Sequence, residues 1–400
     1  MNKIIERPVY SERISKFSDK QIIKVIVGQR RVGKSFILKQ IVNSIKEKKT
    51  KANIIFIDKE KNEFDFIRDY QTLYDYVKDK CSTSTANYLL IDEIQEITHF
   101  EKSLRSLLNE GGIDIYCTGS NADLLSGELA TLLSGRYIEI RVSPLSYTEF
   151  LMFHKLENNN NSLMAFIRFG GLPFLIHLEM EDNLINEYLK NIYSTILFKD
   201  VVKRYSIRNI AFLESLVSFL SDNIGSIVSA KKISDYLKSQ KTEISPRVVL
   251  NYLSFLNNGF LTNKVTRFEI AGKKIFETGE KHYFEDIGIR NAIIGFKQAD
   301  IGKVIENLVY NHMVICGYQV RIGKLGVNEI DFVCQKQNET MYVQVAYLIA
   351  NENTIQREYG NLLKIKDNYP KYVVSMDEFQ GNTYKGIRHL HLREFLNKYW

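Results

Sequence analysis

One glycine-rich stretch of this chain carries residues of the types and spacing that bind phosphate. Residues Gly28–Ser35 read Gly-Gln-Arg-Arg-Val-Gly-Lys-Ser, a complete G-x-x-x-x-G-K-[ST] loop. The two glycines let the backbone turn so that successive N–H groups point at phosphate oxygens. In such a loop Lys34 reaches the β- and γ-phosphates of a nucleotide, and Ser35 holds Mg²⁺. The residues predicted to contact the nucleotide are Gly28, Gln29, Arg30, Arg31, Val32, Gly33, Lys34, Ser35 and Phe36.

A second block, an apolar run that ends in two acids, fits beside this loop. Tyr88–Glu93 reads Tyr-Leu-Leu-Ile-Asp-Glu, the pattern of a buried strand in a parallel sheet. Ligands of such sheets gather beyond the carboxyl ends of the strands. We therefore expect Asp92 near the Mg²⁺ and Glu93 near the attacking water, as its general base. An acid after the aspartate favours ATP over GTP hydrolysis, and the sequence has no Asn-Lys-x-Asp motif for reading guanine.

The elements that must position these residues alternate between strand and helix. An apolar run enters the phosphate-binding loop, and a helical pattern with apolar residues at Ile37 and Ile41 leaves it. Helical patterns also separate the later runs, which predicts a parallel sheet covered by helices. From about residue 150 to residue 222 the pattern is helical. The strand-like runs are Ile22–Val27, Asn53–Ile57, Tyr88–Ile91, Ile113–Cys117 and Tyr137–Val142.

Polar residues after the fourth run each admit two interpretations. Ser120 and Asn121 stand where a side chain can hydrogen-bond the γ-phosphate or the lytic water, or can cap the next helix. That helix is expected over Ala122–Ser134. Arg136 follows it, either as an arginine finger that reaches the nucleotide of a neighbouring subunit or as a cation that suits the helix dipole. The first interpretation of Arg136 implies a homo-oligomer.

Size and composition bound the class of protein. The chain has 400 residues and a net charge of +7, so we expect two to four domains, and the positive charge permits a nucleic-acid partner. Its 4 cysteines show no C-x-x-C spacing, so neither a zinc site nor a disulfide is expected. The N-terminus lacks the apolar segment of a signal peptide, and no apolar run approaches the length of a membrane span. These features predict a cytoplasmic protein without a membrane partner.

Taken together, the motifs resemble those of the AAA-type ATPases of bacteria and archaea. The resemblance rests on the phosphate-binding loop, on Leu-Leu-Ile-Asp-Glu-Ile-Gln, Thr-Gly-Ser-Asn and Ser-Gly-Arg, and on Pro-Leu-Ser-Tyr-Thr-Glu-Phe at residues 144–150. It extends to Phe169–Pro173, which resembles a Gly-Gly-x-Pro turn of the helical lid. In related ATPases that turn lies against the base, which implies Pro173 as an adenine contact; the alternative is that Gly170 and Gly171 only end a helix. The resemblance further implies a winged helix and a restriction-endonuclease-like domain of unknown function.

The middle of the chain reads as a winged helix-turn-helix on its own residues. Ser245-Pro246 is a helix start, and Gly259 ends that helix. Two strands, Phe260–Ile270 and Lys274–Glu277, follow around a tight turn. The motif serves either as a DNA-binding element or as a packing and oligomerisation module. In the first case the major-groove and phosphate contacts would be Arg247, Asn251, Lys264, Arg267, Lys273, Lys274 and Lys281.

The last hundred residues resemble a PD-(D/E)xK nuclease core with a defective site. Such a core places a helix glutamate, a strand aspartate and an (E/Q)-x-K strand together to bind Mg²⁺ and activate water. Glu306 and Asp331 match, but Gln344 stands where an acid is usual and Ala346 stands where the lysine belongs. The sequence leaves open a lysine supplied from another element. Without one, we expect no DNA cleavage and a binding or assembly role instead.

The sequence therefore predicts an α/β protein. Its expected domains are an AAA-type P-loop NTPase core with a parallel sheet (1–150), a helical lid (151–222), a winged helix-turn-helix (223–295) and a PD-(D/E)xK-like α/β domain (296–400). The expected activity is Mg²⁺-dependent ATP hydrolysis, with Lys34, Glu93 and Arg136 as the catalytic residues, that drives a conformational or oligomeric switch, with DNA as a candidate partner. Two alternatives remain open: an ATP-gated nuclease, and a nucleotide-dependent interaction module with negligible turnover.

Overall fold

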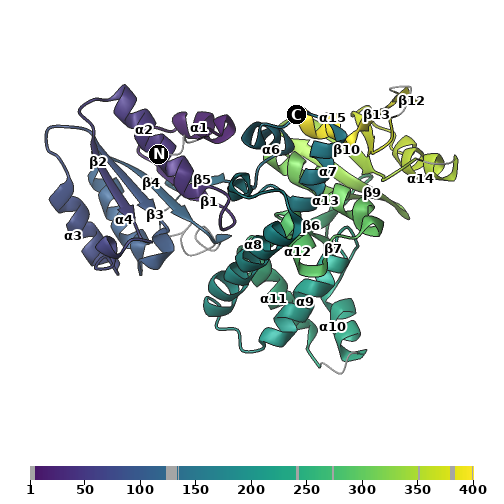
Figure 1. Cartoon of the computed structure of the whole chain (residues 1–400), viewed down its shortest axis with the longest axis horizontal. Helices are drawn as coiled ribbons and strands as arrows, with labels where there is room; N and C mark the ends of the chain where they lie inside the picture. The colour runs from purple at the N-terminus through teal and green to yellow at the C-terminus, as the bar shows by residue number, and fades with distance from the viewer. Residues whose placement is uncertain are drawn as a thin grey trace. The chain divides into compact units, whose positions relative to one another are not determined.

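The chain folds into two compact units in the computed structural model. The structure describes residues 5–122, 133, 135–239, 243–272, 274–349, 352–378, 383–398 and 400, without the side chains of residues 274–278 and 353. The N-terminal unit comprises Met1–Ser143 together with Asn258–Phe260. The C-terminal unit comprises Pro144–Asn257 and Leu261–Trp400. Figure 1 labels the elements of both units along the colour ramp of the chain.

A five-stranded parallel sheet forms the centre of the N-terminal unit. Its strand order is β2-β3-β4-β1-β5, and every neighbouring pair is parallel. This order confirms the predicted α/β class with a parallel sheet. The strands are β1 (Ile23–Val27), β2 (Asn53–Asp58), β3 (Asn87–Asp92), β4 (Ile113–Gly119) and β5 (Tyr137–Arg141).

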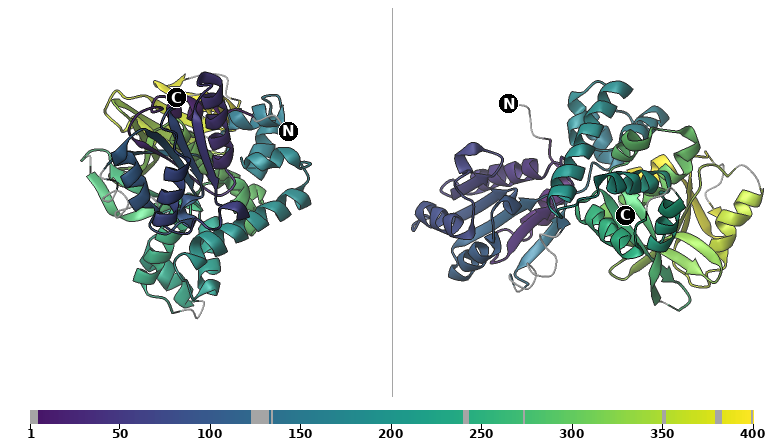
Figure 2. Two further views of the ribbon diagram at one scale, coloured as in Figure 1. Left: turned by 90° about the vertical axis from the view of Figure 1, so that its left-hand side faces the viewer. Right: turned by 90° about the horizontal axis from the view of Figure 1, so that it is seen from below.

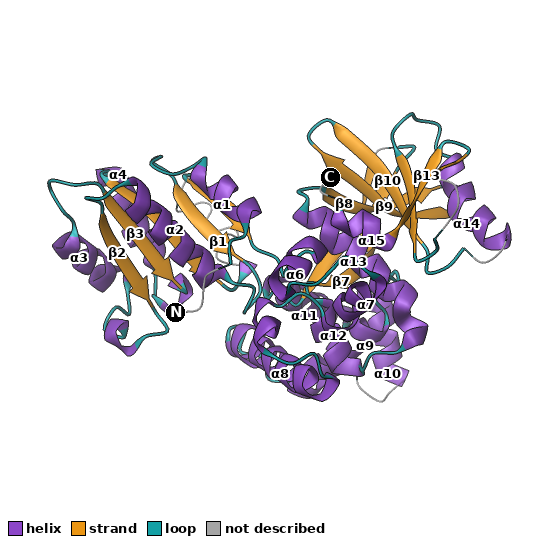
Figure 3. Cartoon of the chain, turned by 45° about the horizontal axis from the view of Figure 1, so that its top comes forward, coloured by secondary structure: helices purple, strands orange, loops and turns teal. Residues whose placement is uncertain are grey.

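Helices cover this sheet, as Figure 3 shows in purple against the orange strands. The helices and the strands share a core of apolar side chains. Such cover is needed because the strands of a parallel sheet are apolar on both faces. Helices α1 and α2 pack against each other and lie side by side in Figures 1 and 2. The helices of this unit are α1 (Pro8–Ser15), α2 (Lys34–Lys48), α3 (Tyr70–Lys80) and α4 (Phe100–Glu110), with short 3₁₀ turns at Asn62–Phe64 and Ile94–Glu96.

The C-terminal unit begins with helices. A π-helical segment, Ile196–Lys203, continues α8 without a break. The helices are α6 (Tyr147–His154), α7 (Asn160–Phe169), α8 (Asp182–Thr195), α9 (Ile210–Asp222), α10 (Ala230–Ser239), α11 (Pro246–Asn258), α12 (Ile287–Ile294), α13 (Ile301–Ile315), α14 (Glu352–Leu363) and α15 (Leu392–Asn397), with 3₁₀ turns at Pro173–His177 and Gln298–Asp300.

A mixed eight-stranded sheet completes the C-terminal unit. Its order is β12-β13-β11-β10-β9-β8-β6-β7. The strands are β6 (Thr262–Glu269), β7 (Lys274–Phe284), β8 (Gln319–Leu325), β9 (Asn328–Lys336), β10 (Glu339–Val345), β11 (Lys371–Ser375), β12 (Thr383–Tyr384) and β13 (Ile387–His391).

The hairpin expected as a wing belongs to this large sheet. Strand β6 pairs with β8 in parallel, from Arg267 opposite Ile322 to Glu269 opposite Lys324. Strand β7 also runs beyond the predicted end at Glu277 to Phe284, because a bulge after Thr266 lets the ladder continue. The large sheet therefore takes strands from both sides of residue 295, where we expected a boundary between two domains. The four-domain division stays a prediction.

The Gly-Gly pair that resembles a lid motif has a steric role within this unit. A Cβ atom on Gly170 would lie 2.5 Å from Asp286 Oδ1, and one on Gly171 would lie 2.5 Å from the Leu145 carbonyl oxygen. Asp286 caps α12 by accepting the Ile289 N–H at 3.0 Å, and it also accepts the Gly171 N–H at 2.8 Å. Glycine is needed here because two backbone segments approach closely.

In the part of the chain that the structure describes, no helix combines the length and the apolar character needed to cross a bilayer.

Candidate nucleotide site

The phosphate-binding loop has the backbone that its glycines predict. Strand β1 ends at Val27, α2 begins at Lys34, and the loop between them bends through Gly28 (φ 153°), Arg31 (φ 70°) and Gly33 (φ 98°). A Cβ atom on Gly28 would lie 2.1 Å from the Val142 carbonyl oxygen. Both the positive φ and the close approach therefore require glycine at the start of the loop.

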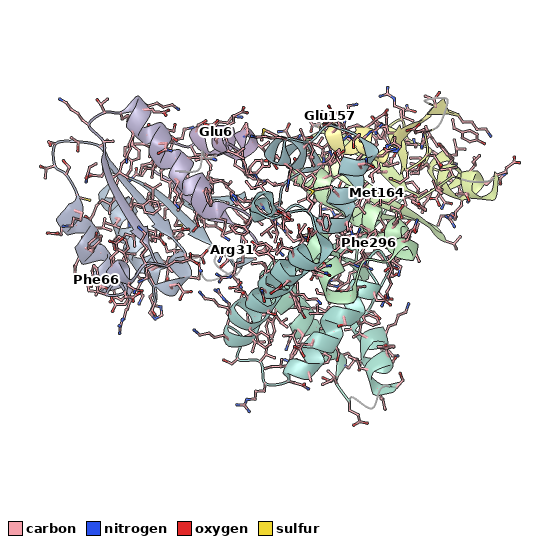
Figure 4. The ribbon with its side chains drawn as sticks, in the orientation of Figure 1. Glu6, Arg31, Phe66, Glu157, Met164 and Phe296 are labelled. Atoms are coloured by element: carbon pink, nitrogen blue, oxygen red, sulfur yellow. The ribbon has the colours of Figure 1, made fainter. Side chains whose placement is uncertain are left out.

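The loop buries most of its side chains. The buried residues are Gln29, Arg30, Val32 and Lys34. Arg31, which Figure 4 labels, is exposed, and so is Phe36 at the start of α2. The Nζ atom of Lys34, a residue only 4% exposed, donates to the carbonyl oxygens of Gly28 and Gln29, each at 3.0 Å. The lysine ammonium thus lies over the turn where successive backbone N–H groups are expected to meet phosphate.

The acid that ends β3 lies close to the loop serine. The buried Asp92 carboxylate accepts a hydrogen bond from Thr118 Oγ1 of the neighbouring strand β4 and another from the Ser35 side chain. Burial raises the pKa of Asp92, and these two hydrogen bonds oppose that shift. The structure thus brings Ser35 and Asp92 together, as the sequence analysis predicted. The sequence analysis gave Thr118 no role of its own, although the residue belongs to the Thr-Gly-Ser-Asn motif at the end of the adjacent parallel strand.

Glu93 is held in an unusual backbone conformation next to Asp92. Its φ is 55°, which is rare for a non-glycine residue, and its N–H donates to Thr118 Oγ1 at 2.9 Å. Its carboxylate Oε2 accepts from Ser120 Oγ at 3.0 Å and from the Gln95 amide. Gln95 is a second contact that the sequence analysis did not identify, although it lies only two residues further along.

Electrostatics keep the Glu93 carboxyl ionised. Burial alone would raise the pKa of Glu93, but the positive charges of Lys34 and Arg30 and the two hydrogen bonds outweigh burial, so the pKa lies below its usual value. Glu93 is therefore a carboxylate at neutral pH. A buried carboxylate of this kind can accept a proton.

Comparisons with known proteins agree with this geometry. A family model described as AAA domain matches residues 20–151, and one described as a domain of unknown function, DUF8612, matches residues 160–300. An uncharacterized protein of Haemophilus influenzae is 36% identical over 400 residues, which are 98% of each chain. An uncharacterized protein of Methanocaldococcus jannaschii is 32% identical over 351 residues, which are 84% of this chain and 77% of that one. This chain belongs to the family of these two proteins. Its residues 20–151 form an AAA domain.

A solved structure supports the fold of the AAA domain. A Walker-type ATPase of Pyrococcus abyssi superposes with a TM-score of 0.52 at 15% identity, over 73% of this chain and 96% of that one. At this identity the likeness shows the fold, which is that of a P-loop ATPase. The family relatives carry no described activity, so the roles of individual residues rest on the geometry above.

The remaining candidates of the AAA domain differ in their surroundings. Ser120 and Asn121 are fully buried, and Ser120 contacts Glu93 as described. Arg136 is exposed, and its guanidinium donates to Asn109 Oδ1. The helix expected over Ala122–Ser134 lies outside the described residues, apart from Ala122 and Leu133. The finger role of Arg136 stays a prediction, as does Pro173 as an adenine contact, which begins a 3₁₀ turn of the C-terminal unit.

The predicted DNA contacts are only partly described. Arg247 and Asn251 are exposed on α11, as expected from the helical pattern. Lys264 forms an ion pair with Glu280 at 2.8 Å, and Arg267 is half-buried. Lys273 and the side chain of Lys274 lie outside the described residues.

The nuclease-like residues do meet, and they meet around a lysine. Asp331 N–H donates to Gln344 Oε1 at 3.2 Å, and the charge of Glu306 of α13 acts on the Asp331 carboxyl. Lys281 of β7 is buried among them: its Nζ lies 2.9 Å from Glu306, 2.8 Å from Glu329 and 3.8 Å from Asp331.

The lysine that is missing at position 346 is therefore replaced from another element, an alternative that the sequence left open. The prediction that Lys281 faces DNA phosphates was wrong, because Lys281 is buried among these acids. Ala346 occupies the position where the lysine is usual. The ammonium group comes instead from Lys281 of β7, which lies 65 residues earlier in the chain. Burial alone would lower the pKa of Lys281, yet the carboxylates of Glu306 and Asp331 raise it above its usual value. Burial also raises the pKa of Asp331, and the charge of Glu306 adds to that shift. Among the described residues, no group of three acid, histidine or cysteine side chains is arranged to hold a metal ion.

Proposed function

We propose that this protein is an ATPase that hydrolyses Mg²⁺-bound ATP in its AAA domain. The observation that carries the proposal is the meeting of the phosphate-binding loop with the two acids at the end of β3. Ser35 hydrogen-bonds Asp92, and the charge of Lys34 lowers the pKa of Glu93. A loop that binds phosphates, oxygen ligands for a cation and an ionised acid are the parts that phosphoryl transfer to water needs.

The residues beside the loop fit Mg²⁺. Hard cations of this size prefer carboxylate, hydroxyl and phosphate oxygens, and Asp92, Ser35 and Thr118 offer such oxygens in one buried place. Burial raises the pKa of Asp92, a cost that a divalent cation would offset. When bound, Mg²⁺ supplies positive charge to the phosphates of the nucleotide. Ser35 and Asp92 are the residues that would hold it.

Each remaining residue has a role in this proposal. Lys34 would exchange its two carbonyl partners for the β- and γ-phosphates, since a charge-assisted bond to phosphate is stronger than one to a neutral carbonyl. Glu93, ionised and fixed by Ser120 and Gln95, would take the proton of the attacking water.

The experiment is a measurement of phosphate release from Mg-ATP by the full chain. Lys34→Ala should abolish both the thermal stabilisation by Mg-ATP and the turnover. At an ATP concentration of about 100 times Kd, that stabilisation amounts to about 2.7 kcal/mol in the wild type. The control variant is Glu63→Gln, which changes an exposed acid of the same domain. If Lys34→Ala keeps the wild-type thermal shift, the loop does not bind the nucleotide. If ATP binds but no phosphate is released, the protein is an interaction module instead.

The proposal extends to a switch on DNA. The net charge of +7 and the exposed Arg247 and Asn251 of α11 support a duplex partner. Turnover should then rise when duplex DNA is added, and the rise should shrink with salt and in Arg247→Ala. Turnover that DNA leaves unchanged at low salt would restrict the function to the ATPase and to protein partners.

A second candidate function is metal-dependent cleavage of phosphodiesters by the C-terminal site. Lys281 is the observation that favours it, because the absence of a lysine was the reason to expect no cleavage. The test is nicking of supercoiled DNA with Mg²⁺ or Mn²⁺, with and without ATP. Nicking that is lost in Lys281→Met and Asp331→Asn, but kept in the exposed control Lys366→Met, would establish it. No nicking under any of these conditions would leave the acids and Lys281 as an internal ion network.

A further inference from the structure

A buried arginine ahead of the first strand touches the phosphate-binding loop. Arg7 follows Glu6, which Figure 4 labels near the start of α1, and Arg7 is only 3% exposed. Its Nη1 donates to the Val32 carbonyl oxygen at 3.1 Å and to the Ser143 carbonyl oxygen at 3.0 Å. One guanidinium thus joins the middle of the loop to the segment that follows β5.

The neighbouring tyrosine fixes the other side of Ser143. The ring of Tyr10 lies under the Arg7 guanidinium, whose carbon is 4.6 Å from the ring centroid. The Tyr10 hydroxyl accepts the Ser143 N–H at 3.1 Å. The N–H and the carbonyl of Ser143 are therefore both held by the N-terminal segment.

The loop depends on this support. Val32 is fully buried between Arg31 and Gly33, two residues with positive φ. A non-glycine residue with positive φ is costly, and it persists only where its surroundings hold it in place. The segment after β5 supports the loop through two neighbouring residues. The Val142 carbonyl oxygen lies against Gly28, and the carbonyl oxygen of the next residue, Ser143, accepts the hydrogen bond from Arg7.

The position of Ser143 gives these contacts a consequence. The chain passes from the N-terminal unit into the C-terminal unit between Ser143 and Pro144. A shift of the Val32 carbonyl when the loop closes on phosphates would change its bond to Arg7, and Arg7 shares its Nη1 with Ser143. The phosphate-binding loop and Ser143, the last residue before the C-terminal unit, are thus joined through the side chain of Arg7.

We propose that Arg7 is a positioning residue that couples nucleotide binding in the loop to the conformation of Ser143. The coupling deepens the proposed function, on which it rests, and it acts in both directions, as linkage requires. Nucleotide binding changes the order of the segment around Ser143, and the loss of Arg7 weakens nucleotide binding. Arginine suits this role because its planar guanidinium packs on the ring of Tyr10 while Nη1 donates to both carbonyl oxygens.

The test compares two arginines of the same segment. Arg13 is the matched control, because its Nη2 donates at 3.0 Å to the Glu139 carbonyl oxygen of β5 rather than to the phosphate-binding loop. Mg-ATP affinity is measured by titration, and hydrogen exchange of a peptide covering Ser143 is measured with and without nucleotide. In the wild type we expect nucleotide to slow that exchange. Arg7→Met should weaken ATP binding about tenfold and remove the change in exchange, whereas Arg13→Met should alter neither.

The outcomes separate this inference from the proposed function. Wild-type binding without any change in exchange at Ser143, or an Arg7→Met variant with unchanged affinity and exchange, would overturn the coupling and leave the ATPase intact. Absence of ATP binding in the wild type would overturn the ATPase first, and the coupling with it. If Arg7→Met fails to fold, Arg7→Lys is the variant to measure; it keeps the charge and should show a partial loss of both effects.

Discussion

Replacing the buried carboxyl of Asp286 should change how the stability of the C-terminal unit depends on pH. Burial raises the pKa of Asp286 to about 6, although hydrogen bonds from the N–H groups of Gly171 and Ile289 oppose the shift. The unfolded value is 3.8. Because the folded-state pKa is the higher one, the folded state binds the proton more tightly than the unfolded chain does.

The sign and size of the effect follow from these two values. The stabilisation is complete below pH 3.8 and is lost as pH rises through about 6. A shift of about two units corresponds to about 3 kcal/mol between the two limits. Between pH 5 and pH 7.5 the wild type should lose about 1.4 kcal/mol of this contribution. Asp286→Asn cannot ionise, so it should lose none of it, whatever constant cost its missing hydrogen bond adds.

The assay is urea unfolding at these two pH values, followed by fluorescence. The chain has 1 tryptophan, Trp400, whose indole packs on Tyr372 and Phe395 of the same unit. The control is Asp235→Asn, which changes an exposed acid of α10 and should follow the wild type at both values. Equal changes with pH in wild type and Asp286→Asn would refute the argument, because Asp286 would then titrate alike in the folded and unfolded chains.

Three further outcomes concern the AAA domain. Glu93→Gln should keep ATP affinity and lose about 10² or more in phosphate release; full turnover would assign the base to another group. Gly28→Ala should destabilise the domain by about 2 kcal/mol or more in thermal unfolding, since its Cβ would lie 2.1 Å from a carbonyl oxygen, whereas Gly112→Ala, at a positive φ with open space around it in the same domain, should cost less. If Arg136 is a finger, mixing Lys34→Ala and Arg136→Ala chains should restore part of the activity; no rescue on mixing would leave Arg136 with a local role.

Much of the nucleotide site could be predicted because its determinants are local. The phosphate-binding motif occupies eight consecutive residues from the end of a strand into a helix, and Asp92 ends a six-residue buried strand that Glu93 directly follows. In a parallel sheet the carboxyl ends of neighbouring strands lie at one edge, so Ser35 and Asp92 could be expected to meet. Thr118 follows the same rule, because it lies at the carboxyl end of the neighbouring strand β4. The sequence analysis assigned contacts to Ser120 and Asn121 instead.

The site around Lys281 could not be predicted in this way. Glu306 lies 25 residues further along the chain and Asp331 lies 50 residues further. The pattern of a strand shows which face of it is buried, but not which strand is its neighbour. The hairpin β6–β7 lies at the edge of the large sheet, and this placement carries Lys281 to the acids. A winged-helix interpretation of the same residues gave no reason to expect it there.

The Gly-Gly pair shows why a motif shared with a family does not by itself assign a contact. The resemblance implies Pro173 as an adenine contact, and the alternative is that Gly170 and Gly171 only end a helix. The steric limits at Gly170 and Gly171 arise instead from Asp286 and Leu145, within the same unit. Gly171→Ala should therefore destabilise the C-terminal unit even without nucleotide, while Pro173→Ala isolates the base contact. A weaker affinity for ATP in Pro173→Ala, with unchanged stability, would support adenine binding; equal affinities would leave the motif with its packing role alone.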